Sequence, residues 1–213
     1  MRVGVLGGTF DPVHFGHIML AEQVAAYLGL PKVVFIPANL PPHKEIERVA
    51  PIGHRIEMLK LAICGNGIFE VSTIECDREG KSYSYKTMEV LREIYPKGTE
   101  FHFIIGSDVL FDLTTFKNID VLSKMCIFAA AIRPGADRAA LSRVAEGLRE
   151  NYGARVCLVP FDEVDISSTQ VKGMIESNEC LEGTLPGAVI DYISSKGLYK
   201  RKKGAASLSS SFL

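Results

Sequence analysis

Short apolar runs alternate along this chain with longer stretches in which apolar residues recur every three or four positions. The short runs predict buried strands, and the longer stretches predict helices with one apolar face. We expect strands at 2–6, 33–36, 69–74, 101–105, 126–132 and 156–159. We expect helices at 15–28, 52–64 and 86–94, and further helices after residues 137, 167 and 186. This alternation is typical of βαβ units with right-handed crossovers, and it predicts an α/β fold with a doubly wound, mostly parallel sheet.

Residues that favour helix ends support these limits. Gly29 and Gly197 follow the last apolar positions of two predicted helices, where a left-handed residue commonly ends a helix. Asp137 is suited to cap the helix that carries Leu141 and Leu148, because its side chain can accept a hydrogen bond from the first turn.

The length and composition predict one globular domain. We place it at 1–199 of the 213 residues, and we expect 200–213, which lack periodicity, to form a disordered tail. A hydrophobic content of 47% with 23% charged residues allows a full core and excludes a disordered chain. Lys and Arg number 24 against 25 Asp and Glu, which leaves a net charge of −1. No overall basic field could therefore hold nucleic acid or an anionic membrane, and any anion site must be built locally.

The sequence favours a cytoplasmic protein. Its apolar runs, such as 125–132, are far shorter than the roughly 20 residues of a membrane span. The first strand runs into a glycine-rich turn, which is not the pattern of a signal peptide. The five cysteines are widely scattered, so we expect reduced thiols rather than a zinc or redox site. The oligomeric state stays open, and a homodimer is compatible with the sequence.

Polar residues gather where the predicted strands end. They occupy 9–17, 41–44, 106–108, position 133 and 167–172. In open α/β sheets, ligands bind at the carboxyl ends of the strands near the topological switch point. The sequence therefore predicts a single site built by five loops.

The strongest chemical signal is the loop at 7–17, Gly-Gly-Thr-Phe-Asp-Pro-Val-His-Phe-Gly-His. Its glycines allow close backbone approach, and the helix that begins here directs free N–H groups and a positive dipole end at a ligand. His14 and His17 share one helix face, and Gly16 leaves room beside both rings. Neither the P-loop nor the dinucleotide fingerprint is present. A zinc site is the alternative, but no Asp, Glu or Cys stands at a supporting spacing.

The pattern Thr-Phe-Asp-Pro-x-His-x-Gly-His resembles the signature of the nucleotidyltransferase superfamily, which implies a Rossmann-like fold. The stretch at 166–172, Ile-Ser-Ser-Thr-Gln-Val-Lys, is similar to the second motif of that superfamily, which lies at a helix start. The two motifs stand about 150 residues apart in the expected order. Together they form a specific signal.

Narrower features resemble those of bacterial nicotinate mononucleotide adenylyltransferases. They are Pro-Pro-His-Lys at 41–44, Ser-Tyr-Ser at 82–84 followed by Thr87, Phe-Ile-Ile-Gly-Ser-Asp at 103–108, Arg-Pro-Gly at 133–135, and the ending at 185–199. Three residues depart from the usual pattern: Ser84 replaces Thr, Phe116 replaces Trp and Lys172 replaces Arg. Each keeps the hydroxyl, ring or charge, but a lysine lacks the bidentate fork of arginine.

The resemblance implies transfer of the adenylyl group of ATP to nicotinate mononucleotide, with pyrophosphate released and Mg²⁺ carried by ATP rather than by a protein metal site. It implies catalytic roles for His14 and His17, whose rings would donate hydrogen bonds to the phosphates. The other residues implied for ATP are Gly8, Thr9, Phe10, Gly106, Asp108, Arg133, Ser167, Ser168, Thr169 and Lys172. Those implied for nicotinate mononucleotide are His43, Lys44, Ser84, Thr87, Asp108 and Phe116.

Ordinary roles stay open for several of these residues when each is considered alone. Ser167 could only cap a helix, Arg133 could form a surface salt bridge, and Phe116 could belong to the core. Two other functions also stay open. The acceptor could be nicotinamide mononucleotide or another phosphorylated molecule such as phosphopantetheine. A non-catalytic nucleotide sensor is the alternative from a different class, although such a protein should lose a motif histidine or the Ser-Ser-Thr motif, and both are present.

Overall fold

The computed structural model describes residues 1–39, 49–76, 78, 80–133, 135–162 and 164–200. Its strands are β1 (Arg2–Gly8), β2 (Val33–Pro37), β3 (Phe69–Val71), β4 (Glu100–Gly106), β5 (Ile127–Ile132) and β6 (Arg155–Pro160). Its helices are α1 (Phe15–Leu28), α2 (Ile52–Ile63), α3 (Ser84–Ile94), α4 (Ser107–Asp112), the 3-10 helix η2 (Leu113–Thr115), α5 (Ile119–Ser123), α6 (Arg138–Tyr152), α7 (Ser168–Ser177) and α8 (Gly187–Lys196).

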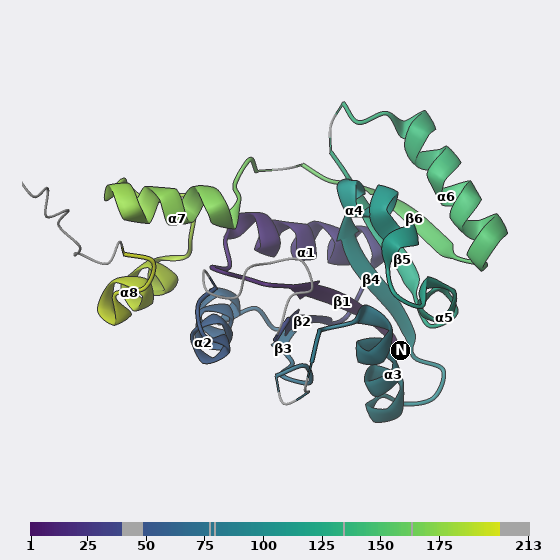
Figure 1. The fold of residues 1–213 in the computed structure, drawn as a ribbon, viewed down its shortest axis with the longest axis horizontal. Helices are drawn as coiled ribbons and strands as arrows, with labels where there is room; N and C mark the ends of the chain where they lie inside the picture. Colours follow the sequence, from purple (N-terminus) through teal and green to yellow (C-terminus); the bar gives the residue numbers. More distant parts are fainter. Residues whose placement is uncertain (40–48, 77, 79, 134, 163, 201–213) are drawn as a thin grey trace, which may run out of the picture.

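The described strands form one parallel sheet in the order β3-β2-β1-β4-β5-β6 (Figure 1). The chain returns to the centre of the sheet between β3 and β4, so the order reverses between β1 and β4. That reversal is the topological switch point of a doubly wound sheet. The predicted fold class is confirmed.

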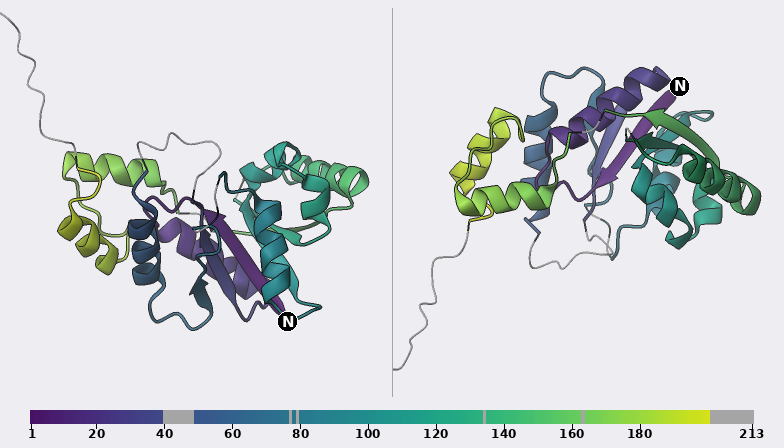
Figure 2. Two further views of the ribbon diagram at one scale, coloured as in Figure 1. Left: turned by 60° about the horizontal axis from the view of Figure 1, so that its bottom comes forward. Right: turned by 90° about the horizontal axis from the view of Figure 1, so that it is seen from above.

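Successive side chains of each central strand enter two separate apolar cores. On β2, Val33 and Phe35 belong to a core with α1, α2, α7 and α8, whereas Val34 and Ile36 belong to a core with α3, α4, α5 and α6. Strands buried on both faces are near-continuously apolar, which is why these runs were recognisable in the sequence. The pair α7 and α8 lies at one end of the molecule and α6 at the other (Figures 1 and 2).

The helix ends follow the sequence prediction. Gly29 and Gly197 end α1 and α8 in the left-handed conformation, with φ of 59° and 62°. The Asp137 carboxylate accepts a hydrogen bond of 3.0 Å from the Ala140 N–H at the start of α6. These local signals were sufficient because each acts within one helical turn.

Two parts of the prediction were wrong. The strand expected at 69–74 is only Phe69–Val71, because the chain then turns, with a hydrogen bond of 2.8 Å from the Cys76 N–H to the Thr73 carbonyl. The helices α4 and α5 and the turn η2 were not predicted, because segments of 6, 5 and 3 residues are too short to show a helical period. None of the helices in the described part of the chain is long and apolar enough to cross a membrane.

Two predicted segments lie outside the described residues. They are the loop at 41–44, with His43 and Lys44, and all but the first residue of the tail predicted at 200–213.

Two glycines of α6 give a matched stability test. Gly147 lies within the helix, where an added side chain would meet open space, whereas Gly153 ends the helix at a φ of 64°. Gly147→Ala should raise the free energy of unfolding by about 1 kcal/mol, because alanine loses less backbone entropy in a helix. Gly153→Ala should lower it by roughly 1–2 kcal/mol, because a Cβ disfavours the left-handed conformation. Urea unfolding of both variants measures this, and changes of the same sign would contradict the assigned helix end.

Candidate active site

The loop after β1 is held in an unusual path. Phe10 has a φ of 48°, and the Asp11–Pro12 peptide bond is cis. The buried Phe10 ring folds back over Gly8, where an added Cβ would lie 3.0 Å from the ring. The same ring meets the edge of the His17 ring, with centroids 5.0 Å apart. The glycine at position 8 is therefore required by Phe10, and Phe10 in turn supports His17.

The rings of His14 and His17 lie against each other at the start of α1, with centroids 3.7 Å apart and a tilt of 36° between the ring planes. The His17 Nδ1 accepts a hydrogen bond of 3.3 Å from the His14 N–H, so a neutral His17 carries its proton on Nε2. A Cβ on Gly16 would lie 3.0 Å from the His14 Nδ1. The prediction that Gly16 leaves room for an imidazole is confirmed for the His14 ring.

Burial lowers the pKa of His14 to about 4. The side chain is only 6% exposed, and among the described residues its Nδ1 has no hydrogen-bond partner. Because desolvation disfavours the charged form, His14 is neutral at pH 7. It can thus act as a hydrogen-bonding group that carries no charge of its own.

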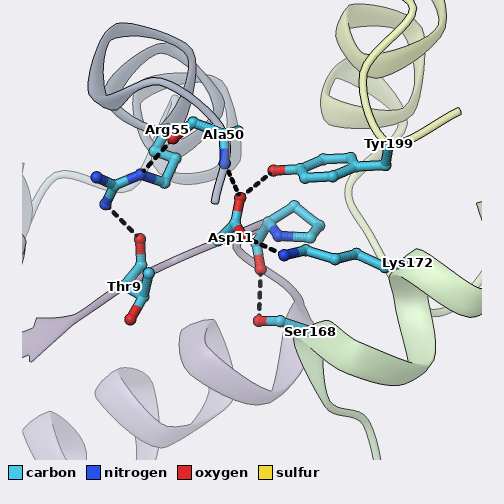
Figure 3. A network of polar contacts seen from close by, with 8 residues as sticks. Thr9, Asp11, Ala50, Arg55, Ser168, Lys172 and Tyr199 are labelled. Atoms are coloured by element: carbon cyan, nitrogen blue, oxygen red, sulfur yellow. Dashed lines mark hydrogen bonds and ion pairs between the residues drawn. The ribbon is translucent and has the colours of Figure 1, made fainter. Parts of the chain in front are cut away.

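The start of α7 packs directly against this loop. The Ser168 hydroxyl donates a hydrogen bond of 3.0 Å to the Pro12 carbonyl, as Figure 3 shows. Ser167 caps α7, accepting from the Gln170 N–H at 3.2 Å, while the Gln170 side chain accepts from the Ser167 N–H. Thr169 is exposed on the first turn. The two sequence motifs, about 150 residues apart, therefore meet, and the capping role considered for Ser167 is present.

The centre of the contact between these segments is the Asp11 carboxylate, which is 1% exposed. It accepts hydrogen bonds from the Ala50 N–H at 3.0 Å and from the Tyr199 hydroxyl at 2.6 Å, and it forms an ion pair with the Lys172 ammonium (Figure 3). The ammonium also lies 5.2 Å from the centre of the Tyr199 ring. Lys172, which the resemblance assigns to ATP phosphates, is thus held here by a protein carboxylate.

Arg55 fixes the other side of the loop. Its side chain is 1% exposed and donates to the carbonyls of Thr9 and Ala38 at 2.8 Å and of Ala50 at 2.9 Å. Burial lowers the pKa of the guanidinium, and the Asp11 charge acts in the opposite direction. Arginine keeps its charge under these conditions. One buried cation therefore joins the β1 loop, the end of β2 and the start of α2.

Asp11, Arg55 and Tyr199 were not among the predicted site residues. Two signals were available. Asp11 stands inside the first motif, and Arg55 lies four residues before the buried Leu59, which places a charge on the apolar face of α2. Nothing local indicated a partner for Tyr199.

The ends of β4 and β5 bring Asp108 and Arg133 together. Their carboxylate and guanidinium are 3.1 Å apart, with the side chains 74% and 50% exposed. This is the surface salt bridge considered for Arg133, and an exposed pair of this kind contributes little stability. A cavity of about 210 Å³ borders Arg133, Gly135 and Phe161, and a Cβ added to Gly106 would meet open space. The pair can therefore open to a ligand at small cost.

The segment that leads into α3 lies beside the end of β2. The Asn39 N–H donates a hydrogen bond of 3.1 Å to the Ser82 hydroxyl, and Ser84, the first residue of α3, is half-buried. Thr87 lies one turn further on, where it is buried and its hydroxyl donates to the Glu75 carboxylate. Thr87 therefore supports the helix start from within, and the contact with nicotinate mononucleotide that the resemblance implies for it stays a prediction.

Three predicted site residues remain, Phe116, His43 and Lys44. Phe116 is half-buried against the core that holds α3 to α6, so a core role accounts for part of its surface. His43 and Lys44 lie outside the described residues. Within the described residues, no group of three or more His, Cys, Asp or Glu side chains could hold a metal ion.

The chain is similar to known proteins in both sequence and fold, and these similarities agree with one another. Residues 5–174 match the model of the cytidylyltransferase-like family. A probable nicotinate-nucleotide adenylyltransferase of Thermoanaerobacter sp. (strain X514) is 40% identical over 94% of this chain and 95% of its own length. A second probable nicotinate-nucleotide adenylyltransferase, from Moorella thermoacetica, is 39% identical over 93% of this chain and 92% of its own length. A solved nicotinic acid mononucleotide adenylyltransferase of Plasmodium falciparum, complexed with NaAD, aligns with a TM-score of 0.76 over 93% of this chain and 97% of that chain, at 16% identity.

Because His14 is buried and neutral, we predict that the free energy of unfolding decreases as the pH is lowered. Above pH 6.5 the residue is neutral in both the folded and the unfolded chain, but between pH 6.5 and about 4 only the unfolded chain gains a proton there. The free energy of unfolding should fall over this window by up to about 3 kcal/mol from His14. Burial also lowers the pKa of His102, which adds a loss of the same sign. Urea unfolding measured between pH 7 and pH 4 should show that the free energy of unfolding falls less in His14→Gln than in the wild type. Equal decreases in the two proteins would contradict a lowered pKa for His14.

Proposed function

The chain belongs to the cytidylyltransferase-like family and, within it, to the nicotinate-nucleotide adenylyltransferases, and we propose that it transfers the adenylyl group of ATP to nicotinate mononucleotide. The products are nicotinate adenine dinucleotide and pyrophosphate, and the reaction serves NAD biosynthesis. ATP enters as its magnesium complex, so the metal arrives with the substrate.

The observation that carries this proposal is the meeting of the two motifs at the end of β1. The start of α7 is bonded to the loop that holds His14 and His17, through Ser168 and Lys172. A helix N-terminus, two imidazoles and an ammonium group beside one another form a site suited to a polyphosphate. Its position at the switch point between β1 and β4 is where an α/β sheet binds a nucleotide.

The two substrates approach from opposite sides of β1. ATP lies over Gly8 to Phe10 and the ends of β4 and β5, with Gly106, Asp108 and Arg133 toward the adenosine. Its β- and γ-phosphates meet Ser167, Ser168, Thr169 and Lys172. The mononucleotide lies beside β2 and the start of α3, where the Ser84 hydroxyl and nearby N–H groups receive the pyridine carboxylate and Phe116 contacts the ring. For its phosphate, the resemblance implies His43 and Lys44, which lie outside the described residues.

The chemistry requires alignment rather than a base. A phosphate oxygen of the mononucleotide, already ionised at neutral pH, attacks the α-phosphorus of ATP as the bond from that phosphorus to the bridging oxygen of pyrophosphate breaks. Catalysis then consists of holding two anions in line and stabilising the charge that develops around the α-phosphorus. His17 donates to that charge most directly, and the neutral His14 adds a second directed hydrogen bond. Since pyrophosphate leaves as an anion, no proton needs to be supplied to it.

The direct test is release of pyrophosphate from ATP with each candidate acceptor. We expect release with nicotinate mononucleotide and far less with nicotinamide mononucleotide or phosphopantetheine. No release with any of the three would contradict the proposed function.

His17→Ala should lower kcat by at least ~100-fold, the loss typical of a missing transition-state hydrogen-bond donor. The affinity for ATP should change much less, because the other phosphate contacts remain. His54→Ala is the matched control, since His54 lies on α2 and contacts Tyr192 rather than the β1 loop. A kcat within threefold of the wild type in a folded His17→Ala protein would show that this loop is not catalytic.

The choice between acid and amide acceptors should depend on Ser84. The two acceptors differ only in a carboxylate or an amide, and a site made of donors leaves the amide NH₂ unpaired at a cost of roughly 1–3 kcal/mol. Charge-assisted bonds favour the acid by a similar amount, so kcat/KM should favour it by about 100-fold or more. Ser84→Ala should narrow this ratio by weakening the acid, whereas Phe116→Ala should weaken both acceptors alike. Equal use of both by the wild type would exclude the nicotinate branch.

A further inference from the structure

The Asp11 carboxylate joins three segments of the chain at the site. Its three donors come from three separate segments: the Ala50 N–H before α2, the Lys172 ammonium on α7 and the Tyr199 hydroxyl after α8. One oxygen, Oδ1, accepts from Ala50 and Tyr199, and the other, Oδ2, faces Lys172 (Figure 3). Oδ1 therefore links the loop to Ala50 and Tyr199, whereas Oδ2 binds only the Lys172 side chain among these three partners.

The Tyr199 hydroxyl remains a donor throughout the neutral range. Burial raises the pKa of this hydroxyl, and its hydrogen bond to the Asp11 carboxylate raises it further. Its backbone lies in the left-handed region, at a φ of 62°, which turns the side chain back toward the site after α8 ends. The carboxylate is thus fixed by a bond that does not titrate near neutrality.

Lys172 needs such a partner more than an arginine would. A lysine side chain has four rotatable bonds and no rigid fork, so an unsupported ammonium must lose rotamer freedom each time it aligns with a ligand. The Lys172 side chain is 25% exposed, with its ammonium held between the Asp11 carboxylate and the Tyr199 ring. An ammonium group carries three N–H donors, so an ammonium that donates one of them to Asp11 can donate another to a phosphate oxygen.

We propose that Asp11 is a positioning residue for adenylyl transfer, which aims the Lys172 ammonium at the triphosphate, and that Tyr199 fixes the carboxylate that does so. The inference rests on the proposed function. Asp11 touches no substrate in this scheme and acts through Lys172. Its negative charge also weakens the attraction of Lys172 for phosphate, so its benefit is orientation during transfer rather than ATP affinity.

The test is a double-mutant cycle on kcat. Asp11→Asn keeps an oxygen that can accept from Ala50 and Tyr199 but loses the ion pair, and it should lower kcat about 10-fold or more, as misplacement of a catalytic contact does. The KM for ATP should stay within threefold. In the Lys172→Met background, the same Asp11→Asn change should lower kcat by less than threefold. In the Lys172→Arg background its effect should also shrink, because the arginine fork orients itself.

A second variant keeps the inference testable if Asp11→Asn does not fold. Tyr199→Phe should lower kcat several-fold in the wild type and have no effect in the Lys172→Met background. Tyr192→Phe is the matched control, because it removes a hydroxyl of α8 that is bonded to His54 at 2.9 Å, and kcat should not change.

Each outcome decides one question. If Asp11→Asn lowered kcat equally in the wild type and in the Lys172→Met background, Asp11 would only stabilise the loop. That result would overturn the inference while the proposed function stands. The inference would also be overturned if Asp11→Asn raised the KM for ATP and left kcat unchanged. A wild type that releases no pyrophosphate with nicotinate mononucleotide would overturn the proposed function and this inference with it.

Discussion

Because β1 and β4 are parallel neighbours whose following helices pack on opposite faces of the sheet, the chain must leave a crevice at their carboxyl ends. The helix α1 follows β1 into one core, and α4 follows β4 into the other. All other features of the site use this crevice. It collects loops from the end of every central strand, and it brings the start of α7 to the loop after β1 although α7 belongs to a distant part of the sequence. The position of the site is thus a property of sheet topology before any catalytic residue is considered.

Topology alone does not hold a loop rigid, and a second constraint does so here. The β1 loop contains one buried charge, the Asp11 carboxylate, and it is hydrogen-bonded to a second, the Arg55 guanidinium of α2. Buried charges are costly unless each is fully bonded, and removal of one partner is more damaging than replacement of both. The conformation of the loop therefore depends on contacts from α2, α7 and Tyr199 together. The site is completed by the last described turn of the chain, which ties its geometry to the folding of the whole domain.

The sequence predicted those features that depend on neighbouring residues. Local patterns were sufficient to predict the strands buried on both faces, helix caps such as Asp137, and the placement of His14 and His17 next to each other. The helices α4 and α5 were missed because they are too short to show a period. The partners of Asp11 could not be predicted for another reason. Lys172 and Tyr199 are 161 and 188 residues away in the chain, and a carboxylate within a glycine-rich loop carries no sign of which distant donor it meets.

The charge pattern of the site also explains how a chain of net charge −1 can bind two polyanionic substrates. Two imidazolium rings at the separation of His14 and His17 would repel each other by about 4 kcal/mol at an effective dielectric constant of about 20. Burial already keeps His14 neutral, so His14 adds no charge of its own to attract ATP. In the proposed function, the attraction for ATP comes from the start of α7, from Lys172 and Arg133, and from the magnesium complexed to ATP. In that proposal the two imidazoles supply hydrogen bonds of fixed direction. Such bonds stabilise the transition state more than the bound substrate, because the charge around the α-phosphorus develops fully only there.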